Sequence, residues 1–284
     1  MNRVKKQLQE IIIILAIVSL AGCAGLGSKS SGPFVQSADN VDIHYSDHGQ
    51  GETALVFVHG WMCDSGYWQD QIAYFKSKYR VVAVDLAGHG QSSLAREDYS
   101  IEKFAGDVAA VVNHLQLDKV ILVGHSLGGP VVMETATVLS AKTIGVVAVD
   151  SFATGYQWPD KNKIPEVVAP FRKNFANETY KMASNMFSAT TDQSLVDKIA
   201  SDMASGPEEV GISAFTRVLE WVASDYQSAR ENLSKPFVQI NAFHKNMPII
   251  RDKIVIVPDV GHFIPQEAPK EFNAALEQAV FLMQ

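Results

Sequence analysis

The sequence has few cysteines and no apolar run long enough to cross a membrane. Only two of its 284 residues are cysteine, Cys23 and Cys63. If Cys23 carries a lipid, as argued below, a single cysteine is left and no disulfide can form within the chain. The longest apolar run, residues 11–20, is well short of the roughly 20 residues that a spanning helix needs. A basic excess is also lacking, since 31 acidic residues face 24 basic ones, so we expect no nucleic-acid partner. Stability must therefore come from a packed core.

The first 22 residues have the pattern of a secretion signal. A basic segment with Arg3, Lys5 and Lys6 precedes the apolar run, which predicts an exported chain with a signal peptide over 1–22. The tetrad Leu-Ala-Gly-Cys at 20–23 resembles the lipobox of bacterial lipoproteins, which implies cleavage before Cys23 and lipidation of that residue. An ordinary signal peptide with an incidental cysteine is the alternative.

Residues 23–33 have the composition of a lipidated, flexible tether. Glycine and serine dominate this stretch, and nothing in it could pack into a core. The resemblance to lipoproteins implies a membrane partner through the lipid on Cys23. Because Ala24 stands where an aspartate often signals inner-membrane retention, we expect an outer-membrane anchor that faces the periplasm or the cell surface.

Strand-like and helix-like segments alternate between residues 34 and 151. Continuous apolar runs mark strands that are buried on both faces, so helices must cover both faces of a mostly parallel sheet. This pattern predicts the α/β class for the first part of a core. The predicted strands are 41–45, 54–58, 80–84, 119–123 and 143–149, and the predicted helices are 65–78, 100–115 and 126–139.

The pattern changes after residue 151 and later returns. Residues 152–235 have helical patterning with few strand signals, which predicts a helical cap inserted between strands of one sheet. Residues 236–284 then form the second part of the core. They contain predicted strands over 236–240 and 253–257 and a closing helix over 268–282.

Ser126 is the candidate nucleophile. It lies at the centre of a Gly-x-Ser-x-Gly turn, after an apolar strand and before a helix. Gly124 and Gly128 leave room for a sharp reversal that holds the serine out at the edge of the sheet. This pattern predicts nucleophilic catalysis by Ser126.

A serine hydroxyl needs a base, and His262 is the best candidate. It follows the predicted strand 253–257 through a short loop and precedes the last helix, so it should emerge at the same sheet edge as Ser126. His125 adjoins the nucleophile, but successive side chains diverge, so we expect it to pack or orient. Three further histidines, His44, His48 and His114, are expected at the surface.

The third catalytic group is less clear. A buried carboxylate commonly fixes the imidazole tautomer, yet the place after the predicted strand 236–240 has none. Asp150 ends the strand beside the one that carries Ser126 and is the preferred acid, although an aspartate at a strand end can also cap a turn. Asp259 and Asp252 are weaker alternatives.

Backbone amides for an oxyanion are predicted next to the serine. The strand before His59-Gly60 ends in a turn that can aim the amide of Trp61 at Ser126. The second donor should be the amide of Leu127, directly after the nucleophile. A simple strand-terminating turn is the alternative for the first donor.

Several motifs together resemble the α/β-hydrolase superfamily. They are HGW at 59–61, VDLAGHGQSS at 84–93, GHSLGG at 124–129 and GHF at 261–263. The resemblance implies the α/β-hydrolase fold, with Ser126 as nucleophile, His262 as base and the amides of Trp61 and Leu127 as the oxyanion hole. It implies a structural role for the loop 85–92, but it does not settle the acid.

The same resemblance bounds the chemistry. Family members with an aspartate nucleophile, such as haloalkane dehalogenases, are excluded by the serine. We expect no cofactor and no metal, since the histidines lack the HExxH-like spacing of zinc ligands. An apolar small-molecule ester is the expected substrate, with four candidate pocket residues: Met62, Phe152, Trp158 and Phe263. Cys63 is expected to be buried and to have no catalytic role.

Three functional hypotheses remain open from the sequence. The first is a lipid-anchored carboxylic-ester hydrolase. The second keeps the same triad but opens lactones, or lets peroxide replace water as in cofactor-free haloperoxidases and perhydrolases. The third is a non-catalytic, ligand-binding lipoprotein, which only the missing carboxylate after Ile240 favours.

Overall fold

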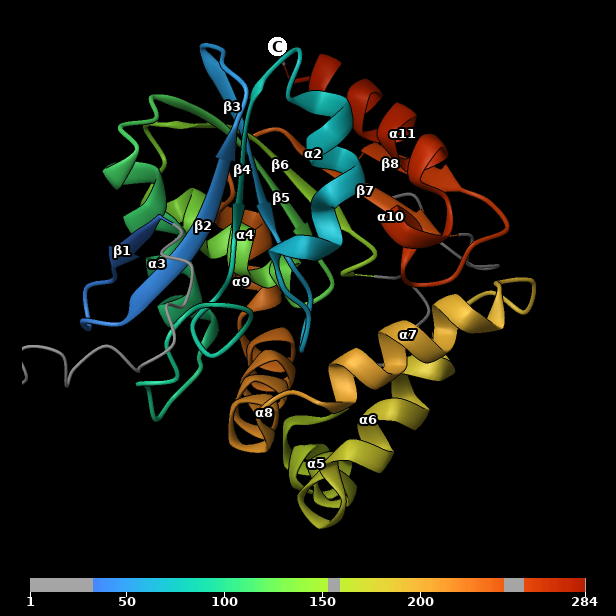
Figure 1. The fold of residues 1–284 in the computed structure, drawn as a ribbon. Coiled ribbons are helices and arrows are strands. Elements are labelled where there is room, and N and C mark those ends of the chain that lie inside the picture. The colour runs from blue at the N-terminus through green and yellow to red at the C-terminus, as the bar shows by residue number, and fades with distance from the viewer. Residues whose placement is uncertain (1–32, 153–158, 243–252, 284) are drawn as a thin grey trace, which may run out of the picture. The chain divides into compact units, whose positions relative to one another are not determined.

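The computed structural model describes residues 33–152, 159–242 and 253–283 (Figure 1). The predicted signal peptide and the predicted lipidation site Cys23 lie outside these ranges, as does Trp158 of the predicted cap. None of the described helices is long and apolar enough to cross a membrane. Secretion, lipidation and the outer-membrane location therefore stay predictions.

A sheet of eight described strands forms the centre of the fold, in the order β1-β2-β4-β3-β5-β6-β7-β8. The β1–β2 and β2–β4 pairings are antiparallel and all the others are parallel. The predicted α/β class is confirmed, and β1 was not predicted. The strands are β1 (Phe34–Gln36), β2 (Asp42–His48), β3 (Thr53–Val58), β4 (Arg80–Val84), β5 (Lys119–His125), β6 (Thr143–Val149), β7 (Phe237–Ala242) and β8 (Lys253–Val257).

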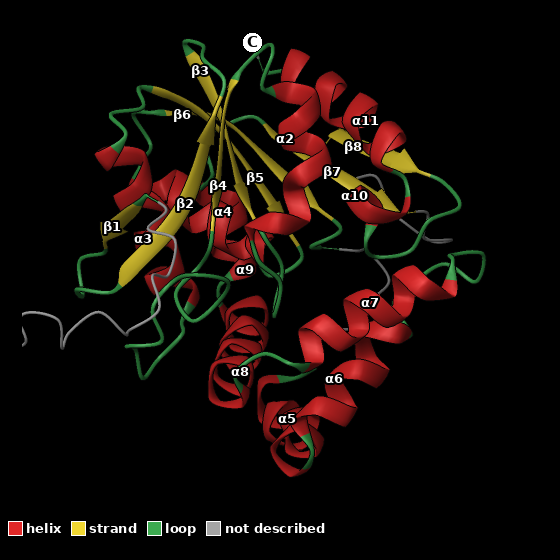
Figure 2. Ribbon diagram, in the orientation of Figure 1, coloured by secondary structure: helices red, strands yellow, loops and turns green. Residues whose placement is uncertain are grey.

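Helices cover both faces of the sheet (Figure 2), which explains why the strands are apolar throughout. Alternate residues of β3 point to opposite faces, with Leu55 and Phe57 in one buried cluster and Val56 and Val58 in the other. The first cluster is completed by α2 (Gln69–Phe75) and α11 (Pro269–Phe281), and the second by α3 (Ile101–His114) and α4 (Gly128–Val138).

The chain between β6 and β7 forms the predicted helical insertion. In Figure 1 most of its helices gather at one end of the sheet, away from the helices that flank the sheet faces. Side-chain caps set where two of them begin, since Asn174 accepts a bond from Asn177 N and Asp192 from Ser194 N. The boundaries at 152 and 235 stay predictions. The helices are α5 (Ile164–Lys173), α6 (Phe175–Ser184), α7 (Gln193–Ala204), α8 (Glu208–Ser224) and α9 (Tyr226–Asn232).

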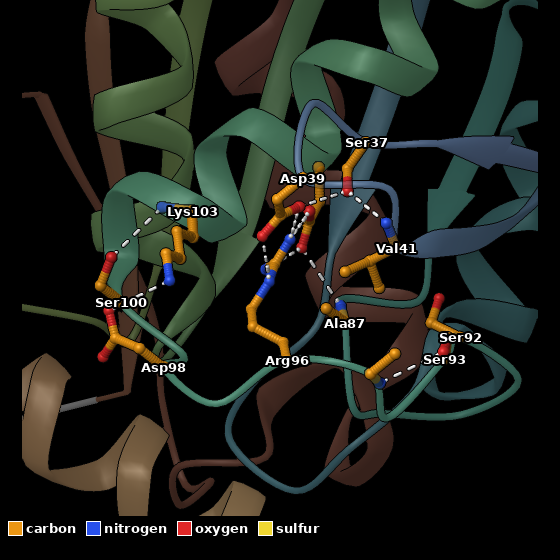
Figure 3. A network of polar contacts seen from close by, with 12 residues as sticks. Ser37, Asp39, Val41, Ala87, Ser92, Ser93, Arg96, Asp98, Ser100 and Lys103 are labelled. Atoms are coloured by element: carbon orange, nitrogen blue, oxygen red, sulfur yellow. Dashed lines mark hydrogen bonds and ion pairs between the residues drawn. The ribbon is translucent and has the colours of Figure 1, made fainter.

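The buried guanidinium of Arg96 joins the β1–β2 turn and the loop after β4 to α3 (Figure 3). Arg96 donates to both carboxylate oxygens of Asp107 on α3, at 2.6 and 2.9 Å, and to both of Asp39, at 2.8 and 2.9 Å. Ser37 donates to Asp39, and the amide of Ala87 donates to Asp107. The β1–β2 turn and the loop after β4 are thereby fixed against α3.

Residues 85–92 form a loop with the structural role that the family resemblance implied. Asp85 accepts hydrogen bonds from the amides of Ser65, at 2.7 Å, and Gln91, at 3.0 Å. It also pairs with His44 Nδ1 at 2.8 Å. The prediction that His44 lies at the surface is wrong. His44 is buried because Asp85 and Ser92 of this loop bind it on the face of β2 opposite to Ile43 and Tyr45.

Candidate active site

Ser126 stands at a sharp turn between β5 and α4. Its φ is +54°, a left-handed conformation that is costly for a residue with a side chain. The amide of Ser126 donates to the carbonyl of Val149 on β6 at 2.9 Å, which holds the turn against the next strand. A Cβ on Gly124 would lie 2.1 Å from the Gly128 carbonyl oxygen, so only glycine fits there. The turn thus has the geometry expected of a nucleophile elbow.

Two backbone amides border this serine. Leu127 follows it directly, at the start of α4. Gly60 passes against it on the other side, because a Cβ on Gly60 would lie 3.2 Å from Ser126 Cβ, and Trp61 comes next. Within the described residues, neither the Leu127 nor the Trp61 amide donates to another protein group. Two unused donors beside a hydroxyl are suited to binding a developing oxyanion.

The turn before Trp61 is held by a neutral histidine. The amide of Leu86 donates to His59 Nε2 at 3.0 Å, so Nδ1 carries the proton and donates to the Gly60 carbonyl at 2.8 Å. Burial lowers the pKa of His59, which keeps the ring uncharged. Its two bonds fix the direction in which the Trp61 amide points.

The Trp61 side chain is fixed by the cap. Its indole N–H donates to the Gly211 carbonyl on α8 at 2.8 Å, and its ring packs against Phe171, Phe175 and Phe215. Trp61 is therefore only 5% exposed. Because the indole is anchored away from the main chain, the backbone of this residue stays at the serine while the side chain joins core and cap.

Asp150 and His262 are in direct contact. Asp150 Oδ2 lies 2.8 Å from His262 Nδ1, and Asp150 Oδ1 accepts the amide of Ala242 at 3.1 Å. The Asp150 side chain is 4% exposed and that of His262 is 18% exposed. A carboxylate at Nδ1 favours the tautomer with the proton on that nitrogen, which leaves Nε2 free to accept a proton.

The main chain of His262 is held from two sides. Its amide donates to the Met186 carbonyl in the cap at 2.7 Å, and its carbonyl accepts the Nε2 proton of His125 at 2.9 Å. The His125 and His262 rings lie 4.7 Å apart. Burial, and then the neighbouring His262, lower the pKa of His125 to about 3, so His125 is a neutral donor. This contact agrees with the orienting role expected for His125.

No hydrogen bond joins Ser126 Oγ to another group within the described residues. His125 nevertheless brings Ser126 and His262 to the same sheet edge, because it precedes the serine and binds the histidine main chain. Bonds between a nucleophile and its base are often long without substrate and tighten when one binds.

The three predicted pocket residues that the structure describes take part in packing. Met62 reaches Gly206 and Gly211 of the cap, where any added Cβ would meet its thioether. Phe152 stacks on Tyr226 at 4.6 Å. Phe263 stacks on a cap phenylalanine, Phe187, at 4.6 Å. Substrate contact by Met62, Phe152 and Phe263 stays a prediction, and Trp158 lies outside the described residues.

The weaker acid candidates and Cys63 gain no support from the described residues. Asp259 is exposed, and Asp252 lies outside the described residues. The end of β7, where a carboxylate is absent, carries the fully buried Asn241, whose amide oxygen and nitrogen have no described partner. Cys63 is buried, and burial raises the pKa of its thiol, which disfavours a nucleophilic thiolate. No cluster of described residues could hold a metal ion.

Two contacts that join core to cap were missed by the sequence patterns. Tyr67, in the 3₁₀ helix Ser65–Trp68, donates from its hydroxyl to Asp202 on α7 at 2.6 Å. Glu267, at the end of the short helix α10 (Ile264–Glu267), accepts bonds from both the His262 loop and the cap. No local pattern signals either contact, because the partners are far apart in the sequence.

Comparison with known proteins gives a family match and several relatives. Residues 55–275 match the alpha/beta hydrolase family. A non-heme haloperoxidase of Rhodococcus erythropolis is 42% identical over 98 residues, which are 34% of this chain and 35% of that protein. A bifunctional esterase/perhydrolase of Acinetobacter calcoaceticus is 41% identical over 98 residues, 34% of this chain and 36% of that protein. The chain therefore spans only about a third of the length of these relatives.

A solved structure extends the likeness to nearly the whole chain. A thermophilic esterase from Thermogutta terrifontis, with malate bound, superposes with a TM-score of 0.76 and covers 89% of this chain and 99% of its own. The identity is 22%, so this similarity concerns the fold.

Proposed function

This chain belongs to the alpha/beta hydrolase family, and we propose that it is a serine hydrolase that cleaves carboxylic esters through an acyl-serine intermediate. One observation carries the proposal: Asp150 Oδ2 lies 2.8 Å from His262 Nδ1. The described end of β7 carries no carboxylate, and among the described residues only Asp150 places a carboxylate on the ring of His262, so the proposed triad depends on this contact.

In the first half of the reaction, Ser126 Oγ attacks the ester carbonyl carbon. His262 Nε2 takes the hydroxyl proton and then gives it to the departing alkoxide, so an alcohol leaves and the acyl group stays on the serine. Asp150 holds the proton on Nδ1 and stabilises the imidazolium that forms between these two steps.

The oxyanion of the tetrahedral intermediate is bound by the amides of Trp61 and Leu127. Each such donor contributes on the order of 3 kcal/mol to transition-state stabilisation. His59 and the α4 N-terminus fix the two donors before the substrate arrives, so little reorganisation is needed during the reaction.

In the second half, water replaces the alcohol. His262 Nε2 removes a proton from water, the oxygen attacks the acyl carbon, and the bond to Ser126 Oγ breaks with return of the proton to the serine. The products are a carboxylic acid and free enzyme. Neither half-reaction requires a metal or an organic cofactor.

We further propose an apolar acyl or alcohol group in the substrate. Phe263 and Phe187 stack beside His262, and Met62 follows the oxyanion turn, so the described surroundings of the catalytic groups are largely apolar. The enzyme is proposed to act at the outer membrane, exported by the signal over 1–22 and anchored through lipidated Cys23.

Two relatives favour a second activity: the haloperoxidase and the esterase/perhydrolase, which are 42% and 41% identical over 98 residues. In this case hydrogen peroxide takes the place of water at the acyl-serine and the product is a peracid. The same triad serves both reactions, because only the second nucleophile differs. Lactone opening is a third use of the same groups, in which the alcohol stays attached to the acid.

A fluorophosphonate probe tests the central proposal, because it reacts only with an activated serine. We expect full-length wild type to be labelled and the variants Ser126→Ala and His262→Ala to remain unlabelled. An exposed histidine provides the control, since His114→Ala should be labelled like wild type. A wild-type protein that resists labelling would support the non-catalytic alternative.

The substrate proposals need product analysis. Wild type is given a series of esters of increasing acyl length, a lactone, and an ester with hydrogen peroxide. Hydrolysis that increases with acyl length supports the apolar-ester proposal, and peracid formation at rates above hydrolysis supports the second activity. Radiolabelled palmitate that appears on wild type but not on Cys23→Ser would support the lipid anchor.

A further inference from the structure

The carboxylate of Glu267 joins the loop that carries His262 to the cap. It accepts the amide of Gly261, at 3.0 and 3.1 Å to its two oxygens, directly before the histidine. It also accepts the amide of Ser188, at 3.1 Å, and the hydroxyl of Thr191, both in the connection between α6 and α7. One side chain thus holds two segments that lie far apart in the sequence.

The two segments are also in direct contact. The His262 amide donates to the Met186 carbonyl at 2.7 Å, and the Phe187 and Phe263 rings stack at 4.6 Å with planes 17° apart. A Cβ on Gly261 would lie 2.3 Å from the Met186 carbonyl oxygen, so any larger residue there would push the segments apart. The α6–α7 connection therefore packs directly against the main chain of the loop that carries His262.

The groups that bind Glu267 are main-chain amides and a hydroxyl rather than a charged side chain; we call Glu267 with these donors, from Gly261, Ser188 and Thr191, the clamp. Within the described residues it has no ion pair with a lysine or arginine, and its partners are two amides and one hydroxyl. A carboxylate that accepts amides from two segments restrains the main chains of both segments at once. A mobile lysine would fix neither.

We propose that Glu267 is a positioning residue that couples the α6–α7 connection of the cap to the base His262. In the structure the Gly261 amide donates to Glu267, the His262 amide donates to the Met186 carbonyl, and His262 Nδ1 lies 2.8 Å from Asp150 Oδ2. Any shift of the connection, including one made by an entering substrate, moves the main chain of His262. This inference rests on the proposed serine-hydrolase function.

If the Glu267 contacts only stabilised the fold, their loss would lower the free energy of unfolding and change nothing else. The coupling role predicts a slower reaction of Ser126 at temperatures far below unfolding, because an ångström-scale displacement of a catalytic group can cost up to about a hundredfold in rate. It also predicts a change in the hydrogen bond between His262 Nδ1 and Asp150. Neither readout responds to a loss of stability by itself.

The test uses matched pairs in the full-length protein. Thr191→Val removes the hydroxyl donor to Glu267 at nearly constant shape, whereas Thr191→Ser keeps it. Glu267→Gln keeps the size of the side chain but replaces one acceptor oxygen by an NH₂ group that cannot accept the amides. Thr190→Val is the control: Thr190 is exposed on the same connection, and its hydroxyl meets the Ser188 hydroxyl at 3.0 Å rather than Glu267 or the Ser188 amide that Glu267 binds.

The rate of Ser126 labelling by a fluorophosphonate is measured together with the melting temperature. We expect Glu267→Gln and Thr191→Val to slow labelling by about tenfold or more well below their melting temperatures. Thr191→Ser and Thr190→Val should match wild type. Equal labelling rates in all variants would overturn the proposal, as would losses that disappear when each variant is compared at the same distance below its melting temperature.

The second readout does not depend on catalysis. The proton between His262 Nδ1 and Asp150 should give a low-field NMR resonance in wild type that is shifted or broadened in Thr191→Val and unchanged in Thr190→Val. If wild type fails to label, the serine-hydrolase proposal fails, but this resonance still tests the coupling. An identical resonance in Thr191→Val and wild type would overturn the coupling itself.

Discussion

Ser126 and Asp150 directly follow neighbouring parallel strands, and both have positive φ, +54° and +45°. The two turns are joined, because the Ser126 amide donates to the carbonyl of Val149, the residue before Asp150. Met62, after the oxyanion turn, is a third such residue with φ of +56°. Three of the six described non-glycine residues with positive φ thus lie at or next to the candidate site, so backbone strain is present there.

That strain gives a prediction about stability. Ser126→Gly should be more stable than Ser126→Ala by about 1 kcal/mol, because glycine adopts positive φ without the cost that a Cβ carries. Both variants remove the hydroxyl, so neither should react with a fluorophosphonate. Denaturant unfolding of the two proteins measures the difference, and equal midpoints at equal slopes would mean that the turn stores no strain.

The role of Asp150 is tested by Asp150→Asn. The Asn carbonyl oxygen can still accept the Ala242 amide, but its NH₂ group then faces His262 Nδ1. That contact favours the tautomer with the proton on Nε2, which cannot accept the serine proton. We expect kcat to fall by about 10⁴ while substrate binding changes little.

Asp259→Asn is the matched control for this variant. Asp259 also has positive φ and precedes His262 by three residues, but it is exposed. It should keep wild-type kcat. If Asp259→Asn loses activity and Asp150→Asn does not, the acid has been misassigned.

The fold could be predicted because its signals are local. The apolar runs that predicted strands over 80–84 and 143–149 coincide with β4 and β6, since both faces of these strands are covered. β1 escaped detection because three residues paired to one neighbour carry no periodicity. His44 was misplaced for a related reason: alternation predicts which face a side chain is on, but not that a distant loop covers that face.

The candidate site was predictable to the extent that strand ends meet at one edge. This rule brought Ser126, Asp150 and His262 together as candidates, and the contact between Asp150 and His262 is present. Glu267 and Tyr67 could not be found in the same way. Their partners lie in the cap, and a single sequence contains no signal for how an inserted segment packs on its core.

Arg96 offers a prediction about buried charge. Its side chain is 2% exposed and that of Asp107 is fully buried, so Arg96→Ala leaves an uncompensated carboxylate inside the protein. We expect a loss of about 3–5 kcal/mol in the free energy of unfolding, measured with denaturant. The ion pair itself need not stabilise the fold by that amount, because much of the loss is the cost of the stranded charge.

Arg80→Ala is the comparison for this variant. Arg80 also binds a carboxylate through two bonds, that of Asp47, but both side chains are more than a quarter exposed. Water can solvate Asp47 once the arginine is gone, so the loss should be about 1 kcal/mol or less. Similar losses in the two variants would show that burial does not set the cost.

His89 gives a prediction about acid stability. Burial, followed by the neighbouring His59, lowers the pKa of His89 to about 3 from an ordinary value of 6.5. Its Nδ1 proton is donated to the Ala87 carbonyl at 3.0 Å, and its buried Nε2 has no described partner, so protonation would create an unsatisfied charge. Between pH 6.5 and about 3 the unfolded chain therefore binds a proton that the folded protein excludes.

More protons on the unfolded state mean that the free energy of unfolding falls as the pH falls. His89 alone should contribute a slope of about 1.4 kcal/mol per pH unit within this window and none above it. The stability that depends on neutral His89 is thus present above pH 6.5 and is lost toward pH 3. His59 and His125 add to the same trend, since burial lowers their pKa values too.

The variant His89→Phe isolates the contribution of His89. It keeps a ring of similar size against Phe104 but removes the titrating group, while every other ionisable residue stays the same. Denaturant unfolding at a series of pH values should give a shallower acid slope than wild type, with the two curves parallel above pH 6.5. Because the lost bond to Ala87 offsets the whole curve equally, the slope rather than the absolute stability decides: identical slopes would mean that His89 takes up its proton in the folded state.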